Sequence, residues 1–193
     1  MKLNLNDIKI ALRDLRQKEK YPPSDGGTVQ SAVLVPLISL KGELSLVYTR
    51  RAGNLARHAG QVSFPGGVRE GDEQTPEDTA LRETCEEIGL SHGRIEVVGQ
   101  MTPYNSSTGF CVFPVVGIIH DANGIRNNIE VERLFFVPLV WLQNPSNSYK
   151  DDYASADGNK HKLWFFKVFN EEEIWGLTAQ ITKDFLALIQ KER

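Results

Sequence analysis

Three glutamates, Glu83, Glu86 and Glu87, have a spacing that could bind a divalent cation. On an α-helix, residues three or four positions apart lie on one face, so these carboxylates converge. Their mutual repulsion destabilises the helix unless a positive charge lies among them. Magnesium and manganese ions favour carboxylate oxygens and leave positions for water and phosphate. The spacing therefore indicates metal-assisted phosphate chemistry, and a solvated acidic face is the alternative interpretation.

Capping signals predict the helix that positions these glutamates. Thr75 suits the N-cap, Pro76 suits the first helical position, and acidic residues follow at the positive end of the helix dipole. Gly89 predicts the end of the helix, because glycine readily adopts the left-handed conformation there. An apolar stripe nearly opposite the glutamates is predicted to be buried. Its members are Leu81, Thr84, Cys85 and Ile88.

This region resembles the Nudix box, in which G, five residues, E and seven residues precede REUxEExGU, where U is aliphatic. It departs from the pattern twice: eight residues separate Glu73 from Arg82, and Thr84 occupies an aliphatic position. The first departure lengthens the loop before the helix, and the second keeps a β-branched residue on the buried face. The matching positions are Gly67, Glu73, Arg82, Glu83, Glu86, Glu87, Gly89 and Leu90.

The resemblance implies an α/β/α sandwich on a mixed β-sheet, and a metal-dependent hydrolase of nucleoside diphosphates linked to another group. Mg²⁺ or Mn²⁺ would bridge the helix carboxylates and the diphosphate oxygens. Glu83 and Glu87 are expected to be the principal ligands, with Glu86 as a further ligand. Gly66 and Gly67 are expected to let a backbone carbonyl approach the metal, and a simple tight turn is the alternative.

The other expected roles concern proton transfer and positioning. Glu83 is the first choice for the group that accepts a proton from the attacking water, and Glu130 is a candidate from outside the box. Arg82 is expected to orient a glutamate such as Glu86, one helical turn away, rather than to touch substrate. Glu73 is expected to be a supporting acid.

Basic residues precede the glycine turn at Arg50, Arg51, Arg57 and His58. Positive charge beside a carboxylate–metal face suits a diphosphate substrate, since the metal neutralises only part of its charge. The three arginines are therefore predicted to bind substrate together with Gly67. A surface basic patch is the alternative, and His58 alone is weaker support for a catalytic role.

The same segment resembles the signature of the coenzyme A pyrophosphatase branch of the Nudix family, LLTxRSA, three residues, R, three residues, G, three residues, FPGG. Tyr48 and Arg51 replace a threonine and a serine of that pattern. Ala56 stands where its later arginine belongs, and Arg57 lies one place along. The stretches 102–119, 130–142 and 174–179 continue the likeness. The matching positions are Leu46, Arg50, Ala52, Gly60 and Phe64–Gly67.

This branch implies cleavage of coenzyme A or its thioesters to 3′,5′-ADP and a 4′-phosphopantetheine product. One alternative is a Nudix pyrophosphatase for ADP-ribose or another nucleoside diphosphate derivative. A second is a nucleotide-binding Nudix module without catalysis, although such a module would not need all three glutamates of the helix intact.

The length of 193 residues predicts one domain over residues 1–193, with two small domains as the alternative. An N-terminal helix at about residues 5–18 is expected as an extension. A net charge of −3 with interspersed signs gives no reason to expect nucleic acid or membrane as a partner. The Nudix resemblance implies a small-molecule diphosphate as the partner. Cys85 and Cys111 fit no zinc or redox spacing, and a reducing, cytoplasmic location is expected. Exposed aromatic residues such as Tyr149 and Tyr153 make a homodimer possible.

Hydrophobic patterns predict an α/β or α+β domain. Residues 145–159 form a polar insertion, predicted to be a surface loop, and residues 175–189 form a closing helix. Two strands joined by a Lys41–Gly42 turn form a probable hairpin. The predicted strands are Val29–Ser39, Glu43–Thr49, Arg94–Met101, Cys111–His120, Leu134–Val137 and Lys162–Phe169.

Overall fold

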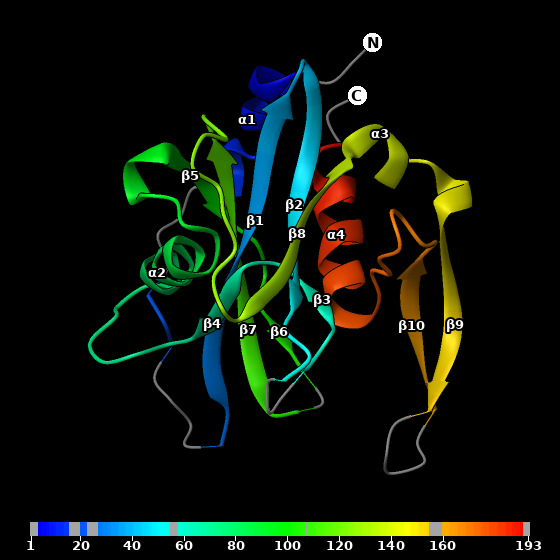
Figure 1. Cartoon of the computed structure of the whole chain (residues 1–193). Coiled ribbons are helices and arrows are strands. Elements are labelled where there is room, and N and C mark those ends of the chain that lie inside the picture. The colour runs from blue at the N-terminus through cyan, green and yellow to red at the C-terminus, as the bar shows by residue number, and fades with distance from the viewer. Residues whose placement is uncertain are drawn as a thin grey trace.

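A computed structural model of the chain describes residues 4–15, 20–22, 27–54, 58–106, 108–154 and 160–190. Its centre is a mixed β-sheet with helices on both faces (Figure 1). This confirms the expected α/β/α arrangement. Among the described residues, no helix has the length and apolar character to cross a bilayer.

The central strand β1 (Val29–Leu40) runs parallel to β7 (Phe110–Ile119) and antiparallel to β2 (Glu43–Arg51). Lys41 and Gly42 join β1 to β2 with positive φ angles of 50° and 79°, which suit a tight hairpin turn. The predicted hairpin is therefore confirmed. The other strands of this sheet are β3 (Val62–Ser63), β4 (Gly66–Val68), β5 (Ile95–Gln100), β6 (Tyr104–Asn105) and β8 (Val131–Pro138).

Alternation along β1 divides the core between the two faces of the sheet. Leu34 and Ile38 belong to the cluster that includes Ile88 of helix α2 (Pro76–Ile88). Val35 and Leu37 belong to a second cluster, which includes side chains of helices α1 and α4. These helices, with the short α3, span Leu5–Ala11 (α1), Gly176–Leu188 (α4) and Leu139–Leu142 (α3).

The N-terminal helix is shorter than the predicted range of 5–18. An α-helix covers Leu5–Ala11 and a 3₁₀ turn covers Arg13–Leu15, while residues 16–18 lie outside the described residues. Ile8 and Leu12 are buried, so the amphipathic pattern correctly predicted the face that packs on the sheet.

The prediction of a surface loop over residues 145–159 was wrong for most of that segment. A 3₁₀ turn covers Pro145–Asn147, and β9 (Ser148–Ala154) follows. β9 pairs antiparallel with β10 (Lys160–Phe166), and Tyr149 stacks on Phe165 with ring centroids 5.6 Å apart. The polar composition concealed this strand because nearly all of β9 is exposed, so no apolar face marks it. Residues 155–159 lie outside the described residues.

Candidate functional site

Helix α2 has the termini that the sequence predicts. The Thr75 side chain accepts a hydrogen bond from the Asp78 N–H, and the Asp78 carboxylate accepts one from the Thr75 N–H. This reciprocal capping box satisfies backbone donors that the first turn leaves free. Gly89 ends the helix in the left-handed conformation, with φ 70°. The helix therefore holds its glutamates in a fixed register against strand β4.

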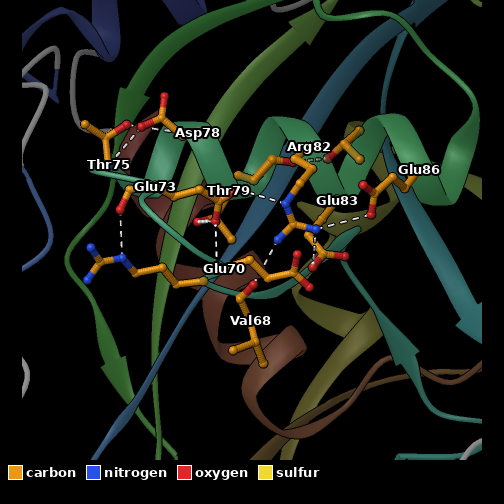
Figure 2. A network of polar contacts seen from close by, with 12 residues as sticks. Val68, Glu70, Glu73, Thr75, Asp78, Thr79, Arg82, Glu83 and Glu86 are labelled. Atoms are coloured by element: carbon orange, nitrogen blue, oxygen red, sulfur yellow. Dashed lines mark hydrogen bonds and ion pairs between the residues drawn. The ribbon is translucent and has the colours of Figure 1, made fainter.

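Arg82 is the centre of a polar network on the exposed side of α2 (Figure 2). Its guanidinium lies 2.8 Å from Glu73, 3.0 Å from Glu83 and 3.2 Å from Glu86, measured between nitrogen and carboxylate oxygen. It also donates to the carbonyl of Val68 at 2.9 Å. Arg82 thus supplies the positive charge that the clustered carboxylates need, and it tethers α2 to the preceding loop.

Glu73 is held from three directions. Besides Arg82, the Thr79 hydroxyl donates to its carboxylate at 2.6 Å, and the Glu70 N–H donates at 2.9 Å. Burial opposes ionisation of Glu73, but these hydrogen bonds outweigh burial and lower its pKa. Its carboxylate therefore serves as a fixed anchor for Arg82, which agrees with the supporting role expected of it.

Glu83 lies directly against the backbone of Gly67. A β-carbon at Gly67 would overlap the Glu83 carboxyl group, so a larger residue would displace that group. Burial raises the pKa of Glu83, with Arg82 opposing the effect and the charges of Glu86 and Glu70 adding to it. The absence of a side chain at Gly67 is thus what lets this carboxylate reach the backbone of β4. Gly66 and Gly67 lie in this strand, paired with β1, so the alternative interpretation of a simple tight turn was wrong.

Glu87 is buried, with 3% of its surface exposed. Its carboxylate accepts a hydrogen bond from the Gly66 N–H at 3.3 Å and lies 3.7 Å from a guanidinium nitrogen of Arg51. Burial raises the pKa of Glu87 to about 8, although Arg51 opposes this. A second cation beside Glu87 would stabilise its charged form further.

The three glutamates differ in environment, contrary to the expectation of one face opposite the apolar stripe. Glu86 has 58% of its side chain exposed, whereas Glu87 lies on the buried side with Thr84 and Ile88. Helical spacing alone places Glu87 at the boundary between faces, and packing of α2 on β1 and β4 covers it. Thr84 keeps its hydroxyl satisfied at the aliphatic position by donating to the Ala80 carbonyl at 2.6 Å.

The expected metal ligands therefore separate into a pair and an outlier. Glu83 and Glu87 both approach the Gly66–Gly67 pair of strand β4, and Glu86 points to Arg82. Within the described part of the chain, no three acidic, histidine or cysteine side chains gather closely enough to enclose a metal ion. Two carboxylates beside the glycine pair of β4 still fit Mg²⁺ or Mn²⁺, since such ions often keep water and phosphate at their remaining coordination positions.

The predicted substrate-binding arginines lie in different environments. Arg50 and Arg51 are consecutive residues of β2, so their side chains point to opposite faces of the sheet, and a register shift in the pairing with β8 falls between them. Arg51 lies beside Glu87, whereas Arg50 lies 3.6 Å from Glu172 and 3.5 Å from Glu132. The Nε atoms of both arginines are buried without a hydrogen-bond partner. Ala56 and Arg57 lie outside the described residues.

Glu130, the other candidate base, lies in the loop before β8 with its side chain exposed. Its carbonyl accepts a hydrogen bond from the Ala52 N–H at 2.8 Å, which holds the loop beside the end of β2. Its charge contributes to raising the pKa of Glu87, so the two carboxylates lie within electrostatic range. His58, by contrast, pairs with Gln61 at 2.9 Å.

Sequence reasoning missed Thr79 and Glu172. Thr79 links Glu73 to Tyr21, and its position one turn before Arg82 on the same helix was a usable signal. Glu172 is only 2% exposed and lies near both Arg50 and Arg133. It belongs to an irregular turn far from both arginines in sequence, so no spacing could have connected them.

Comparison with known proteins agrees with this geometry. The NUDIX domain family matches residues 28–156. An uncharacterised Nudix hydrolase, NudL, from Photorhabdus laumondii is 38% identical over 83% of this chain and 84% of its own. NudL from Yersinia pestis is 39% identical over 80% of this chain and 76% of its own.

Solved structures support the fold alone. An Ap4A hydrolase from C. elegans is similar with a TM-score of 0.50 and 17% identity, covering 58% of this chain and 82% of its own. The Nudix hydrolase RenU from M. smegmatis has a TM-score of 0.50 and 22% identity, covering 58% of this chain and 71% of its own. Because the NUDIX family model matches residues 28–156 and NudL is 38% identical over most of both chains, the chain belongs to the Nudix hydrolases, enzymes that act on small nucleoside diphosphate derivatives.

Proposed function

We propose that this Nudix hydrolase cleaves the diphosphate bond of coenzyme A or a derivative of it, giving 3′,5′-ADP and a 4′-phosphopantetheine product. The observation that carries the proposal is the convergence of Glu83 and Glu87 on the Gly66–Gly67 pair of β4, with Arg51 beside Glu87. Opposite charges around a strand segment with little side-chain bulk suit a diphosphate bridged to carboxylates.

The residues that match the FPGG part of the coenzyme A signature pack against strands β1 and β2. Phe64 stacks on Tyr48 with ring centroids 4.8 Å apart, and the Pro65 carbonyl accepts the Leu34 N–H at 2.8 Å. Gly66 has φ 158°, and a β-carbon there would lie 2.6 Å from the Val33 Cα, so no larger residue fits. The FPGG segment is thus fastened to β1 and β2 and holds its glycines against α2.

The proposed cleavage depends on a divalent cation. Mg²⁺ or Mn²⁺, when bound, would neutralise diphosphate oxygens and orient the attacking water. Glu83 and Glu87 would hold the cation, Glu86 is a further candidate, and Arg51 would pair with a phosphate oxygen. Arg82 and Glu73 would keep Glu83 in place. Glu83 is our first choice for the proton acceptor and Glu130 the second.

The test is incubation of the purified chain with coenzyme A and, separately, with ADP-ribose. Each reaction is run with Mg²⁺, with Mn²⁺ and with a chelator, and products are identified by mass. We expect metal-dependent 3′,5′-ADP from coenzyme A. Cleavage of ADP-ribose alone would keep the enzyme class and reject the substrate.

One alternative substrate class is favoured by a specific residue. Ala56 replaces an arginine of the coenzyme A signature, which makes ADP-ribose or another nucleoside diphosphate derivative the second candidate. Lack of turnover with either compound would instead favour a nucleotide-binding module, and binding of ADP-ribose measured by calorimetry would then distinguish that third possibility.

A further inference from the structure

The β9–β10 ribbon has an open edge at the periphery of the molecule (Figure 1). β10 lies toward α4 and is joined to the body through the Phe165–Trp175 bridge. Among the described residues, β9 pairs with β10 alone, so no second strand covers its outer edge. A two-stranded ribbon is marginal by itself, and an open edge is a template for pairing with another strand.

The hydrogen-bond pattern shows which residues of β9 face outward. The Asp152 N–H donates to its neighbour Asp151 at 2.7 Å instead of to β10. The Phe166 N–H donates to Ile174 at 2.8 Å, so the pair Phe166–Ser148 is likewise not hydrogen-bonded within the ribbon. Outward groups alternate along a strand, and they therefore belong to the even-numbered residues of β9.

We propose that a second copy of this chain pairs with β9 in antiparallel fashion, across a two-fold axis through Asp151. In an antiparallel pair, outward residues must face outward residues, so only registers that match even with even are available. The axis then passes through a single residue. Only an axis through Asp151 brings Lys150 opposite Asp152 of the other copy, whereas axes through Lys150 or Asp152 place like charges at the axis without gaining that attractive pair.

The register through Asp151 is complementary in charge and shape. It places each Lys150 opposite Asp152 of the other copy, and each Tyr149 opposite Tyr153. The tyrosines are 42% and 40% exposed, so they have surface to bury. Directly opposed aromatic and oppositely charged pairs stabilise antiparallel strands, and a two-fold axis makes each pair occur twice.

Repulsion between the two Asp151 carboxylates weakens a dimer in this register. The two copies of this carboxylate would meet at the axis, where like charges repel. Asp151 also occupies the Asp152 N–H, which pairing must release. The dimer is therefore weak and reversible in the wild-type chain, and Asp151→Asn should strengthen it.

Sedimentation equilibrium of the full chain over a range of concentrations tests whether β9 forms a dimer interface. We expect a reversible dimer. K150D should raise its dissociation constant by about tenfold or more, because two attractive pairs become repulsive. The double swap K150D/D152K should restore it. K167D, an equal charge change at an exposed position outside β9, should leave it unaffected. A wild-type chain that stays monomeric up to about 1 mM would overturn the proposal.

A single cysteine tests the register. At the axis, opposite Cα atoms are about 4.5–5.5 Å apart, which a disulfide spans. D151C should therefore form a disulfide-linked dimer under mild oxidation, whereas K162C on β10 should not. The wild-type chain controls for Cys85 and Cys111. Dimerisation that K150D leaves unchanged, or that D151C fails to trap, would assign the contact to another surface and reject this one.

Discussion

Glu87 and Gly66 are joined by a hydrogen bond of 3.3 Å from the glycine N–H to the glutamate carboxylate. The bond connects α2 directly to β4, and on the other side Arg51 lies 3.7 Å from the same carboxylate. The Glu87 carboxylate is therefore held between Arg51, at the end of β2, and Gly66, at the start of β4. Burial raises its pKa to about 8, so its charged form is costly unless positive charge is near.

Glu87→Gln should lower metal-dependent turnover by at least about 100-fold, the scale of losing one preorganised electrostatic contact. The amide keeps the size of the side chain and removes its charge. In chelator the variant should unfold at a temperature no lower than wild type, because it buries no charge at this position. Steady-state kinetics and thermal unfolding measure the two effects. Glu77→Gln is the matched control, and wild-type turnover by Glu87→Gln would disprove the assignment.

Gly67→Ala should displace the Glu83 carboxyl group, since the added β-carbon overlaps it. We expect kcat/KM to fall by about 100-fold, because small displacements of a catalytic group have effects of this size. Gly93→Ala is the control, as no heavy atom lies within 4 Å of a β-carbon at that position. Equal kinetics for the two variants would mean that Glu83 has no role in turnover.

Local signals account for what the sequence predicted well. The cap at Thr75, the stop at Gly89 and the hairpin turn at Lys41–Gly42 each depend on neighbouring residues only, and the structure confirms all three. The assigned metal and substrate residues stay predictions. The structure nevertheless shows that Glu83, Glu87 and Gly66–Gly67 meet at one place.

Long-range packing accounts for what could not be predicted. The burial of Glu87 depends on how α2 lies on β4, which helical periodicity does not contain. β9 becomes a strand because β10 pairs with it, and its own residues are polar and exposed. Strand alternation separates Arg50 from Arg51, but their acidic partners, Glu172 and Glu87, lie far along the chain and depend on tertiary packing.

Arg82→Lys should destabilise the fold by about 1–3 kcal/mol, because a lysine cannot span Glu73 and the Val68 carbonyl with one rigid fork. Glu86→Gln should change stability by less than about 0.5 kcal/mol, since Glu86 is largely exposed. Urea unfolding in chelator measures both. If the two substitutions had equal effects, Arg82 would be a surface residue rather than the tether of α2.

Glu96 links α1 to the sheet, with Lys9 at 2.7 Å and His120 at 3.0 Å. The hydrogen bond from Lys9 is the largest of the influences that lower the pKa of Glu96. A lowered folded-state pKa contributes stability above the unfolded value and loses it as pH falls through the folded value. Glu96→Gln should therefore cost about 0.5 kcal/mol at pH 7 and progressively less as the pH falls below the usual pKa of a glutamate. Asp14→Asn, at an exposed pair, is the control for unfolding measured at each pH.

Ala56→Arg tests the substrate directly. The coenzyme A signature has an arginine at this position, and here the arginine stands one residue later, at Arg57. A displacement of one residue would point the arginine side chain in a different direction, so we expect Arg57 to replace that arginine poorly. We expect Ala56→Arg to raise kcat/KM for coenzyme A while leaving ADP-ribose cleavage unchanged. If Ala56→Arg has no effect and Arg57→Ala lowers kcat/KM, Arg57 already provides the contact and the substitution at Ala56 is no loss.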